Sequence, residues 1–122
     1  MSKKYVLGID NGGTVIKAAI YDAEGNVHAL AQSHMDTLVP QPLFTERDSE
    51  DLWDANVRAI RRCLDQSDVD AADIAALAIT GHGNGLYLAR RDGSPARNGI
   101  ISTDARAQSY VDRWLARPDY KD

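Results

Sequence analysis

The chain has 122 residues, of which 43% are hydrophobic and 26% are charged, a composition typical of a globular domain. Its 14 basic and 18 acidic residues give a net charge of -4 without a basic patch, which argues against a nucleic-acid or anionic-membrane partner. One cysteine excludes an intrachain disulfide, and the N-terminus has no apolar stretch of signal-peptide length, so we expect a cytoplasmic protein with no membrane span.

Three runs of β-type residues open the chain and predict an antiparallel meander. They cover Tyr5–Asp10, Val15–Tyr21 and Val27–Ser33 and are joined by short polar turns. The first turn contains Asn11-Gly12, a strong hairpin signal between two apolar runs. A purely structural hairpin that binds no ligand is therefore one interpretation of this turn.

The first turn also carries residues suited to binding phosphate. Gly12 and Gly13 allow backbone N–H groups to approach phosphate oxygens, and Thr14 adds a hydroxyl donor. Asp10 precedes the turn and could orient a water molecule bound to Mg²⁺. This ion is usually held by only one or two carboxylates and keeps several of its waters. Lys17 either meets phosphate as a point charge or lies on the outward side of the second strand.

The middle of the chain predicts a loop, a helix and a strand. Residues 43–47 are expected to form an ordered loop, and Asp48 caps a helix that ends near Gln66. The apolar run Ile74–Thr80 predicts a buried strand parallel to the first. Apolar residues at helical spacing predict the buried stripe of the helix, namely Trp53, Val57, Ile60 and Leu64.

The last third begins with a second glycine-rich turn at Gly81–Gly85. Leu86–Arg90 and Gly99–Ser102 then flank a predicted hairpin turn at Asp92-Gly93. A final helix begins at Thr103 or Asp104, ends before Pro118, and is predicted to bury Ala107, Tyr110, Val111, Trp114 and Leu115. Because ligands of α/β sheets bind beyond the carboxyl ends of the strands, we expect the two glycine-rich turns to share one cleft.

Four motifs, taken together and in register, resemble one family of enzymes. They are Gly8–Lys17, Gln41–Asp48, Ala78–Gly85 and Ile101–Arg106. The first resembles the phosphate motif of the actin, hexokinase and heat-shock ATPase superfamily, and the set resembles the FGGY carbohydrate kinases within it. The resemblance implies a ribonuclease-H-like α/β domain with a three-strand antiparallel meander, a parallel strand and two helices. Residues 1–122 would be the N-terminal part of the first kinase domain, with the second lobe absent.

The resemblance further implies ATP-dependent phosphorylation of a sugar hydroxyl, with a pentulose as the expected class of substrate. Asp10 would hold Mg²⁺ through water. Gly12, Gly13, Thr14 and Lys17 would bind the phosphates of ATP.

The resemblance places sugar contacts on His82, Gly83, Asn84 and Asp104, with Glu46 as a sugar-side or structural residue. Xylulose kinases have Met-His, and glycerol kinases have Arg-Glu, where this chain has Gly83-Asn84. The identity of the sugar therefore stays open. The alternative for His82 is that it is simply exposed on the surface without a ligand. The alternative for Asp104 is that it only caps a helix.

No residue matches the aspartate that serves the family as catalytic base, so no catalytic residue is assigned. We expect the 122 residues alone to be inactive as a kinase. The alternative is a truncated, non-catalytic module for phosphate, nucleotide or protein binding. The expected partner is a small sugar, with a homodimer left open and neither nucleic acid nor membrane expected.

Overall fold

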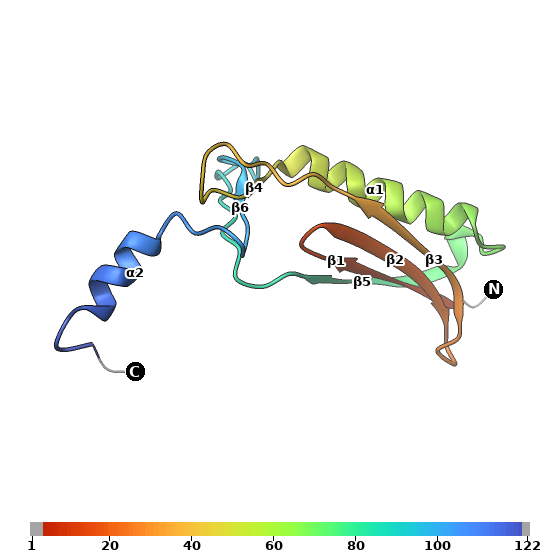
Figure 1. Cartoon of the computed structure of the whole chain (residues 1–122). Coiled ribbons are helices and arrows are strands. Elements are labelled where there is room, and N and C mark those ends of the chain that lie inside the picture. The colour runs from red at the N-terminus through yellow and green to blue at the C-terminus, as the bar shows by residue number, and fades with distance from the viewer. Residues whose placement is uncertain (1–3, 121–122) are drawn as a thin grey trace.

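The computed structural model describes residues 4–120 and centres on a four-stranded mixed sheet with one long helix on one face (Figure 1). The strand order is β3-β2-β1-β5. Strands β1 (Tyr5–Asn11), β2 (Val15–Asp22) and β3 (Val27–His34) form an antiparallel meander. Strand β5 (Ile74–Gly81) pairs in parallel with β1, after a short 3₁₀ turn at Ala71–Asp73. These findings confirm the predicted meander and the predicted parallel strand.

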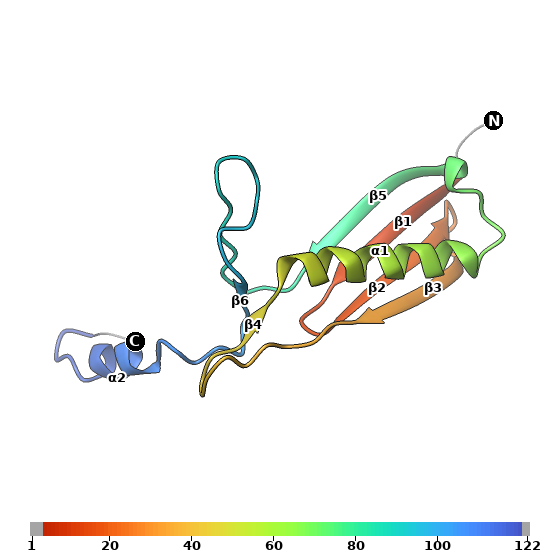
Figure 2. The same ribbon diagram turned by 90° about the horizontal axis from the view of Figure 1, so that it is seen from above.

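Helix α1 (Ser49–Asp65) provides the other half of the core and runs along the sheet (Figure 2). The side chain of Asp48 caps it by accepting hydrogen bonds from the backbone N–H groups of Glu50 and Asp51, as predicted. Small residues face the sheet, which brings the helix close to β2 and β3. They are Ala55, Ala59 and Cys63, all fully buried together with Ile16 and Ile20 of β2.

The predicted buried stripe of α1 is only partly right. Val57, Ile60 and Leu64 are half-buried, but Trp53 is 69% exposed. The helical spacing was correct and its angular phase was not, because three small residues, rather than the large ones, make the closest contact with the sheet.

Strand β5 is also less buried than its apolar sequence predicts. Leu77 and Ile79 are 52% and 62% exposed. The physical reason is the position of the strand at the edge of the sheet, beyond β2 and β3, against which α1 packs.

A second, two-stranded sheet joins two distant segments of the chain. Strand β4 (Glu46–Arg47) pairs antiparallel with β6 (Gly99–Ile100), so the segment predicted as an ordered loop ends in a short strand. The predicted hairpin around Asp92-Gly93 is present and is closed by backbone hydrogen bonds from Arg90 to Ser94 and from Ala96 to Leu88, but its two sides form isolated bridges rather than a continuous ladder. The strand expected over Leu86–Arg90 was therefore wrong, whereas the one expected over Gly99–Ser102 is present as the shorter β6.

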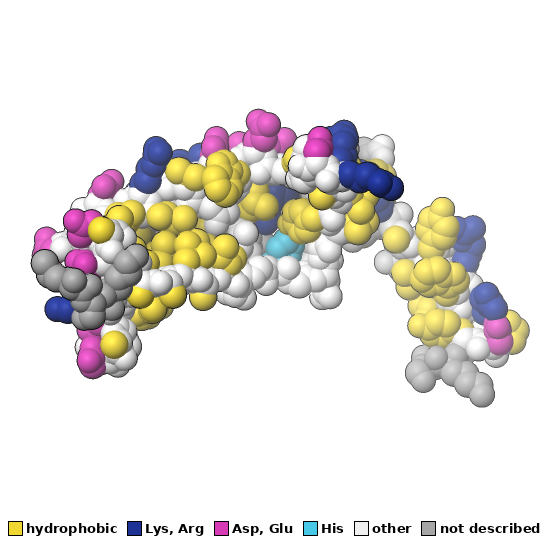
Figure 3. Space-filling model, turned by 180° about the vertical axis from the view of Figure 1, so that it is seen from behind, with side chains coloured by type: hydrophobic (Ala, Val, Ile, Leu, Met, Phe, Trp, Pro, Cys, Tyr) yellow, Lys and Arg dark blue, Asp and Glu magenta, His cyan; other side chains and the backbone are white. Residues whose placement is uncertain are grey.

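Helix α2 (Gln108–Leu115) begins later than predicted and projects away from the sheet (Figures 1 and 2). Its predicted buried side was wrong, since residues 107–120 are all exposed. Apolar side chains are visible on this helix and along the sheet in Figure 3. Between residues 4 and 120, neither helix is long and apolar enough to cross a membrane.

The turn between β2 and β3 yields a pH-dependent prediction. Asp22 accepts hydrogen bonds from the side chains of Asn26 and His28, which lower its pKa to about 2. Because the carboxyl pKa is lower in the folded turn, ionised Asp22 stabilises the fold at pH values above its unfolded pKa, which is near 3.9. This stabilisation is lost as the pH falls toward 2. We expect the Asn26 amide resonance to titrate with that low midpoint and to stay constant in Asp22→Asn. A midpoint near 3.9 would contradict the arrangement.

Candidate functional site

The two glycine-rich turns lie side by side because β1 and β5 are parallel neighbours. Both strands finish at the same end of the sheet, where Asp10 is paired with Thr80 and Asn11 with Gly81. The backbone N–H of His82 donates to the carbonyl oxygen of Asn11 at 3.1 Å. The two turns are therefore neighbours, but the prediction that they share one cleft was wrong, because Asp10 lines a groove on one face of the sheet and His82 lines a separate pocket.

Asp10 and Lys17 lie together on the face of the sheet opposite α1. Their charged groups are 3.9 Å apart across the β1–β2 ladder, and each side chain is about half exposed. A groove of about 440 Å³ on this face is lined by both residues and by Thr80. Thr14, at the end of the turn, is exposed. The groove thus presents a carboxylate and an ammonium group to solvent at the carboxyl end of β1.

The glycines of the first turn differ in their surroundings. A Cβ added to Gly12 would lie 2.6 Å from the carbonyl oxygen of Val15, so a close backbone approach requires glycine here. A Cβ added to Gly13 would meet open space. Neither residue has a positive φ, so the hairpin does not use the mirror-image two-residue turn that Asn-Gly favours.

The donor set at this edge fits Mg²⁺ better than a transition metal. Within residues 4–120, no group of three or more His, Cys, Asp or Glu side chains gathers into a metal cage. Asp10 offers one accessible carboxylate, and Mg²⁺ commonly binds through one or two carboxylates, several waters and substrate phosphates.

The second turn borders a separate pocket of about 300 Å³ on the other side of the strand ends. Asn11, Arg47, Leu52 and His82 contribute to its lining, together with Gly81 and Tyr87. The imidazole of His82 packs edge-on against Tyr87, and its Nε2 atom is buried without a hydrogen-bond partner. The pKa of His82 is lowered, because burial disfavours the imidazolium ion and the positive charge of Arg47 adds to the effect.

Gly83 and Asn84 are exposed in the same turn as His82. Asn84 has a φ of 61°, in the left-handed region that asparagine tolerates better than most residues.

Asp104 and Glu46 belong to one ion cluster, in which both carboxylates already have partners. The carboxylate of Asp104 accepts from the backbone N–H of Thr45 and from the guanidinium of Arg106, which holds its pKa well below the usual range. Arg106 also pairs with Glu46 at 2.8 Å, and Arg97 pairs with the same Glu46 oxygen at 2.6 Å. The cluster ties β4 to the segment before α2. Asp104 does not begin a helix, so its predicted capping role was wrong.

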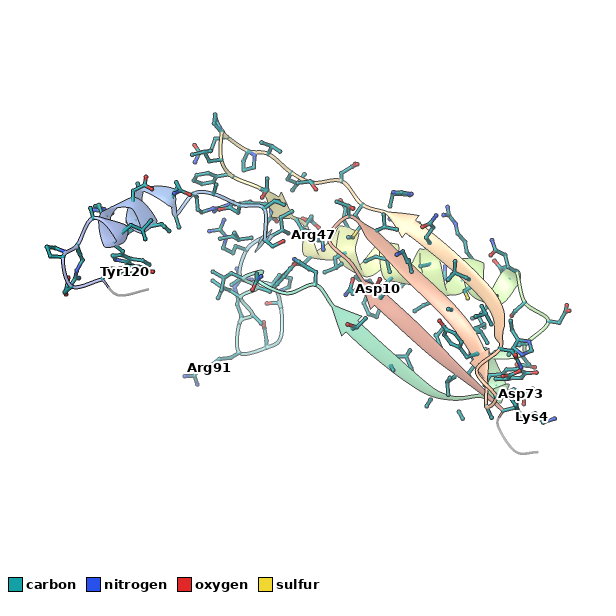
Figure 4. All side chains as sticks on the ribbon, turned by 60° about the horizontal axis from the view of Figure 1, so that its bottom comes forward. Lys4, Asp10, Arg47, Asp73, Arg91 and Tyr120 are labelled. Atoms are coloured by element: carbon teal, nitrogen blue, oxygen red, sulfur yellow. The ribbon has the colours of Figure 1, made fainter. Side chains whose placement is uncertain are left out.

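Sequence reasoning overlooked Arg47. Its side chain is only 2% exposed, and its Nη1 donates a hydrogen bond to the carbonyl oxygen of Gly12 at 3.2 Å. Arg47 therefore holds the backbone of the first turn in place. Figure 4 shows Arg47 and Asp10 at the same end of the sheet. In the sequence, an arginine between Glu46 and Asp48 is typical of a charged surface. Its positive charge was the one signal that could have suggested a ligand-binding role.

Comparison with known proteins identifies relatives over nearly the whole chain. Residues 5–121 match the sequence model described as "FGGY family of carbohydrate kinases, N-terminal domain". The "L-xylulose/3-keto-L-gulonate kinase" of Escherichia coli (strain K12) is 38% identical over 111 residues, which cover 91% of this chain and 22% of that protein. The "Probable L-xylulose kinase" of Pasteurella multocida (strain Pm70) is 36% identical over 110 residues, covering 90% and 23%.

Solved structures agree with the sequence relatives. The crystal structure of gluconate kinase from Lactobacillus acidophilus superposes with a TM-score of 0.81 at 25% identity, covering 92% of this chain and 22% of that one. The chain thus spans between a fifth and a quarter of the length of the relatives that it matches.

Proposed function

The chain belongs to the FGGY family of carbohydrate kinases, and from this premise we propose that it supplies the phosphate-binding turn and part of the sugar site of an ATP-dependent sugar kinase. The observation that carries the proposal is the placement of Asp10 and Lys17 on an accessible groove at the carboxyl end of β1, next to the second glycine-rich turn. Sheets of this type bind ligands at such strand ends.

Each part of the turn has a role in the proposed site. Gly12, Gly13 and Thr14 bind the phosphates of ATP, and Lys17 neutralises part of their charge. Asp10 holds Mg²⁺ through water. When bound, the ion neutralises charge on the phosphates during phosphoryl transfer. Since Asp10 and Lys17 are neighbours in the ladder, the metal and the phosphates would lie on the same face of β2.

The acceptor is a sugar or a sugar derivative with a free hydroxyl, and a pentulose is the leading class. The relatives' names include L-xylulose, a pentulose, which supports this class, and also 3-keto-L-gulonate, a six-carbon sugar acid, so the names do not select one compound. We assign His82, Gly83 and Asn84 to the sugar side. Asp104 is kept as a sugar-side prediction, although its oxygens already engage Arg106 and the Thr45 N–H group.

We place the carboxylate base outside these 122 residues, and we place the protein in the cytoplasm. The proposal predicts that the 122-residue chain binds MgATP at millimolar concentration but does not phosphorylate a panel of pentuloses. Calorimetric titration measures the binding, and a coupled ADP-release assay measures turnover. Turnover would contradict the position of the base. Absence of MgATP binding would instead favour the structural-hairpin interpretation.

A further inference from the structure

Arg47 is a buried cation for which the protein supplies little compensation. Its side chain is 2% exposed, yet within residues 4–120 it forms no ion pair with a carboxylate. A guanidinium has five N–H donors, and only Nη1 has a recorded protein acceptor, the carbonyl oxygen of Gly12. Burying a charge without a counter-charge is costly, so a cation kept in this state calls for an anion.

The carboxylates nearest to Arg47 along the chain are engaged elsewhere. Glu46 pairs with Arg97 and Arg106, and Asp48 caps α1. Asp10 lines the groove on the opposite face and pairs with Lys17. None of these three carboxylates lines the 300 Å³ pocket that Arg47 borders.

His82 lines the same pocket and carries a polar atom without a partner. The Nε2 atom of His82 is buried and makes no hydrogen bond, while the rest of the ring is held against Tyr87. Arg47 comes from β4, His82 from the turn after β5 and Asn11 from the end of β1, and all three line this pocket. Three segments distant in sequence therefore bring a cation, an unpaired imidazole nitrogen and an amide to one small cavity.

We propose that Arg47 and His82 form a subsite for a small oxyanion, a carboxylate or a phosphate group. A guanidinium recognises both groups through paired N–H donors, and the Nε2–H tautomer of His82 adds a further donor. A neutral hydroxyl would satisfy hydrogen bonds but would leave the charge of Arg47 uncompensated. The subsite is separate from the Asp10–Lys17 groove but includes His82, so the inference rests on the sugar side proposed above and adds a bound anion to it.

The test uses nuclear magnetic resonance of the full 122-residue chain at constant pH and ionic strength. Sodium phosphate, sodium gluconate and the neutral polyol glucitol are titrated separately, with sodium chloride replaced as each salt is added. The signals followed are those of the His82 ring and the Arg47 Nε–H group. We expect saturable shifts of both signals with at least one of the two anions and weaker binding of glucitol, which lacks the negative charge.

The three probes also identify the source of the anion. Saturation by gluconate alone assigns the subsite to a carboxylate, saturation by phosphate alone assigns it to a phosphate, and saturation by both supports a general oxyanion site. Shifts that stay linear with both anions would overturn the proposal, as would equal saturation by glucitol.

Variants test whether anion binding depends on Arg47 itself or on the positive charge of the protein in general. Arg47→Gln should weaken anion binding about tenfold or more, since it removes hydrogen bonds to a charged group. Arg91→Gln is the matched control, because Arg91 is exposed and lies far from Arg47 (Figure 4). Arg47→Lys keeps the charge and loses the planar fork, and it serves if the glutamine variant does not fold. Equal binding by the Arg47 and Arg91 variants would overturn the assignment.

A parallel titration with MgATP keeps the two proposals distinguishable. Anion binding that depends on Arg47 without MgATP binding would support the subsite and contradict the proposed nucleotide site. MgATP binding without any saturable anion binding would do the reverse.

Discussion

Replacing Asp10 by asparagine is expected to weaken MgATP binding at least about tenfold, since a charge-assisted hydrogen bond contributes roughly 1.5–3 kcal/mol. The carboxylate faces an open groove and its only described ion pair is with Lys17 at 3.9 Å. Exposed pairs of this kind contribute about 0–1 kcal/mol, so the fold should tolerate the change. Calorimetric titration measures the affinity, and circular dichroism checks that the variant is folded.

The role assigned to Asp10 is specific to the metal, and this permits a sharper control. In EDTA, wild type and Asp10→Asn should bind ATP with the same weak affinity, or the variant should bind it slightly better, because a negative charge has been removed beside a polyanion. Asp54→Asn, an exposed carboxylate change on α1, should behave as wild type in both conditions. An equal loss of affinity with and without Mg²⁺ would show that Asp10 supports the turn rather than the ion.

Local signals were sufficient to predict the part of the fold that carries this site. The runs of β-type residues before and after Asn11-Gly12 predicted β1 and β2, and the Asp48 cap located the start of α1. The parallel pairing of β5 followed from a helix placed between two apolar strands. These elements bring the two glycine-rich turns to one edge, which is why the neighbouring positions of Asn11 and His82 could be anticipated.

Features that depend on long-range partners could not be predicted in the same way. Asp104 is a residue type that commonly caps helices, yet its carboxylate accepts from the backbone N–H of Thr45, which lies 59 residues earlier in the chain. The pairing of β4 with β6 joins two-residue strands that carry no periodic signal. Nothing in the sequence distinguishes Arg47 from an arginine on the surface. Its burial is seen only in the structure, where the strand ends pack around it.

Truncating Ile20 to alanine is expected to lower the free energy of unfolding by about 2–5 kcal/mol, the usual cost of removing a buried aliphatic side chain. Ile20 is fully buried on the face of β2 that packs against α1. A loss of this size is a large fraction of the roughly 5–15 kcal/mol that stabilises a typical domain. Urea denaturation followed by circular dichroism measures the change.

Leu30→Ala is the matched control because it removes an aliphatic side chain of the same size from the other face of the sheet. Leu30 is 57% exposed and lines the groove beside Asp10, so its loss should cost only about 1 kcal/mol or less. Equal losses at Ile20 and Leu30 would mean that the second face of the sheet is covered in solution. The groove would then be closed to nucleotide, and the proposed phosphate site on Asp10 and Lys17 would have to be abandoned.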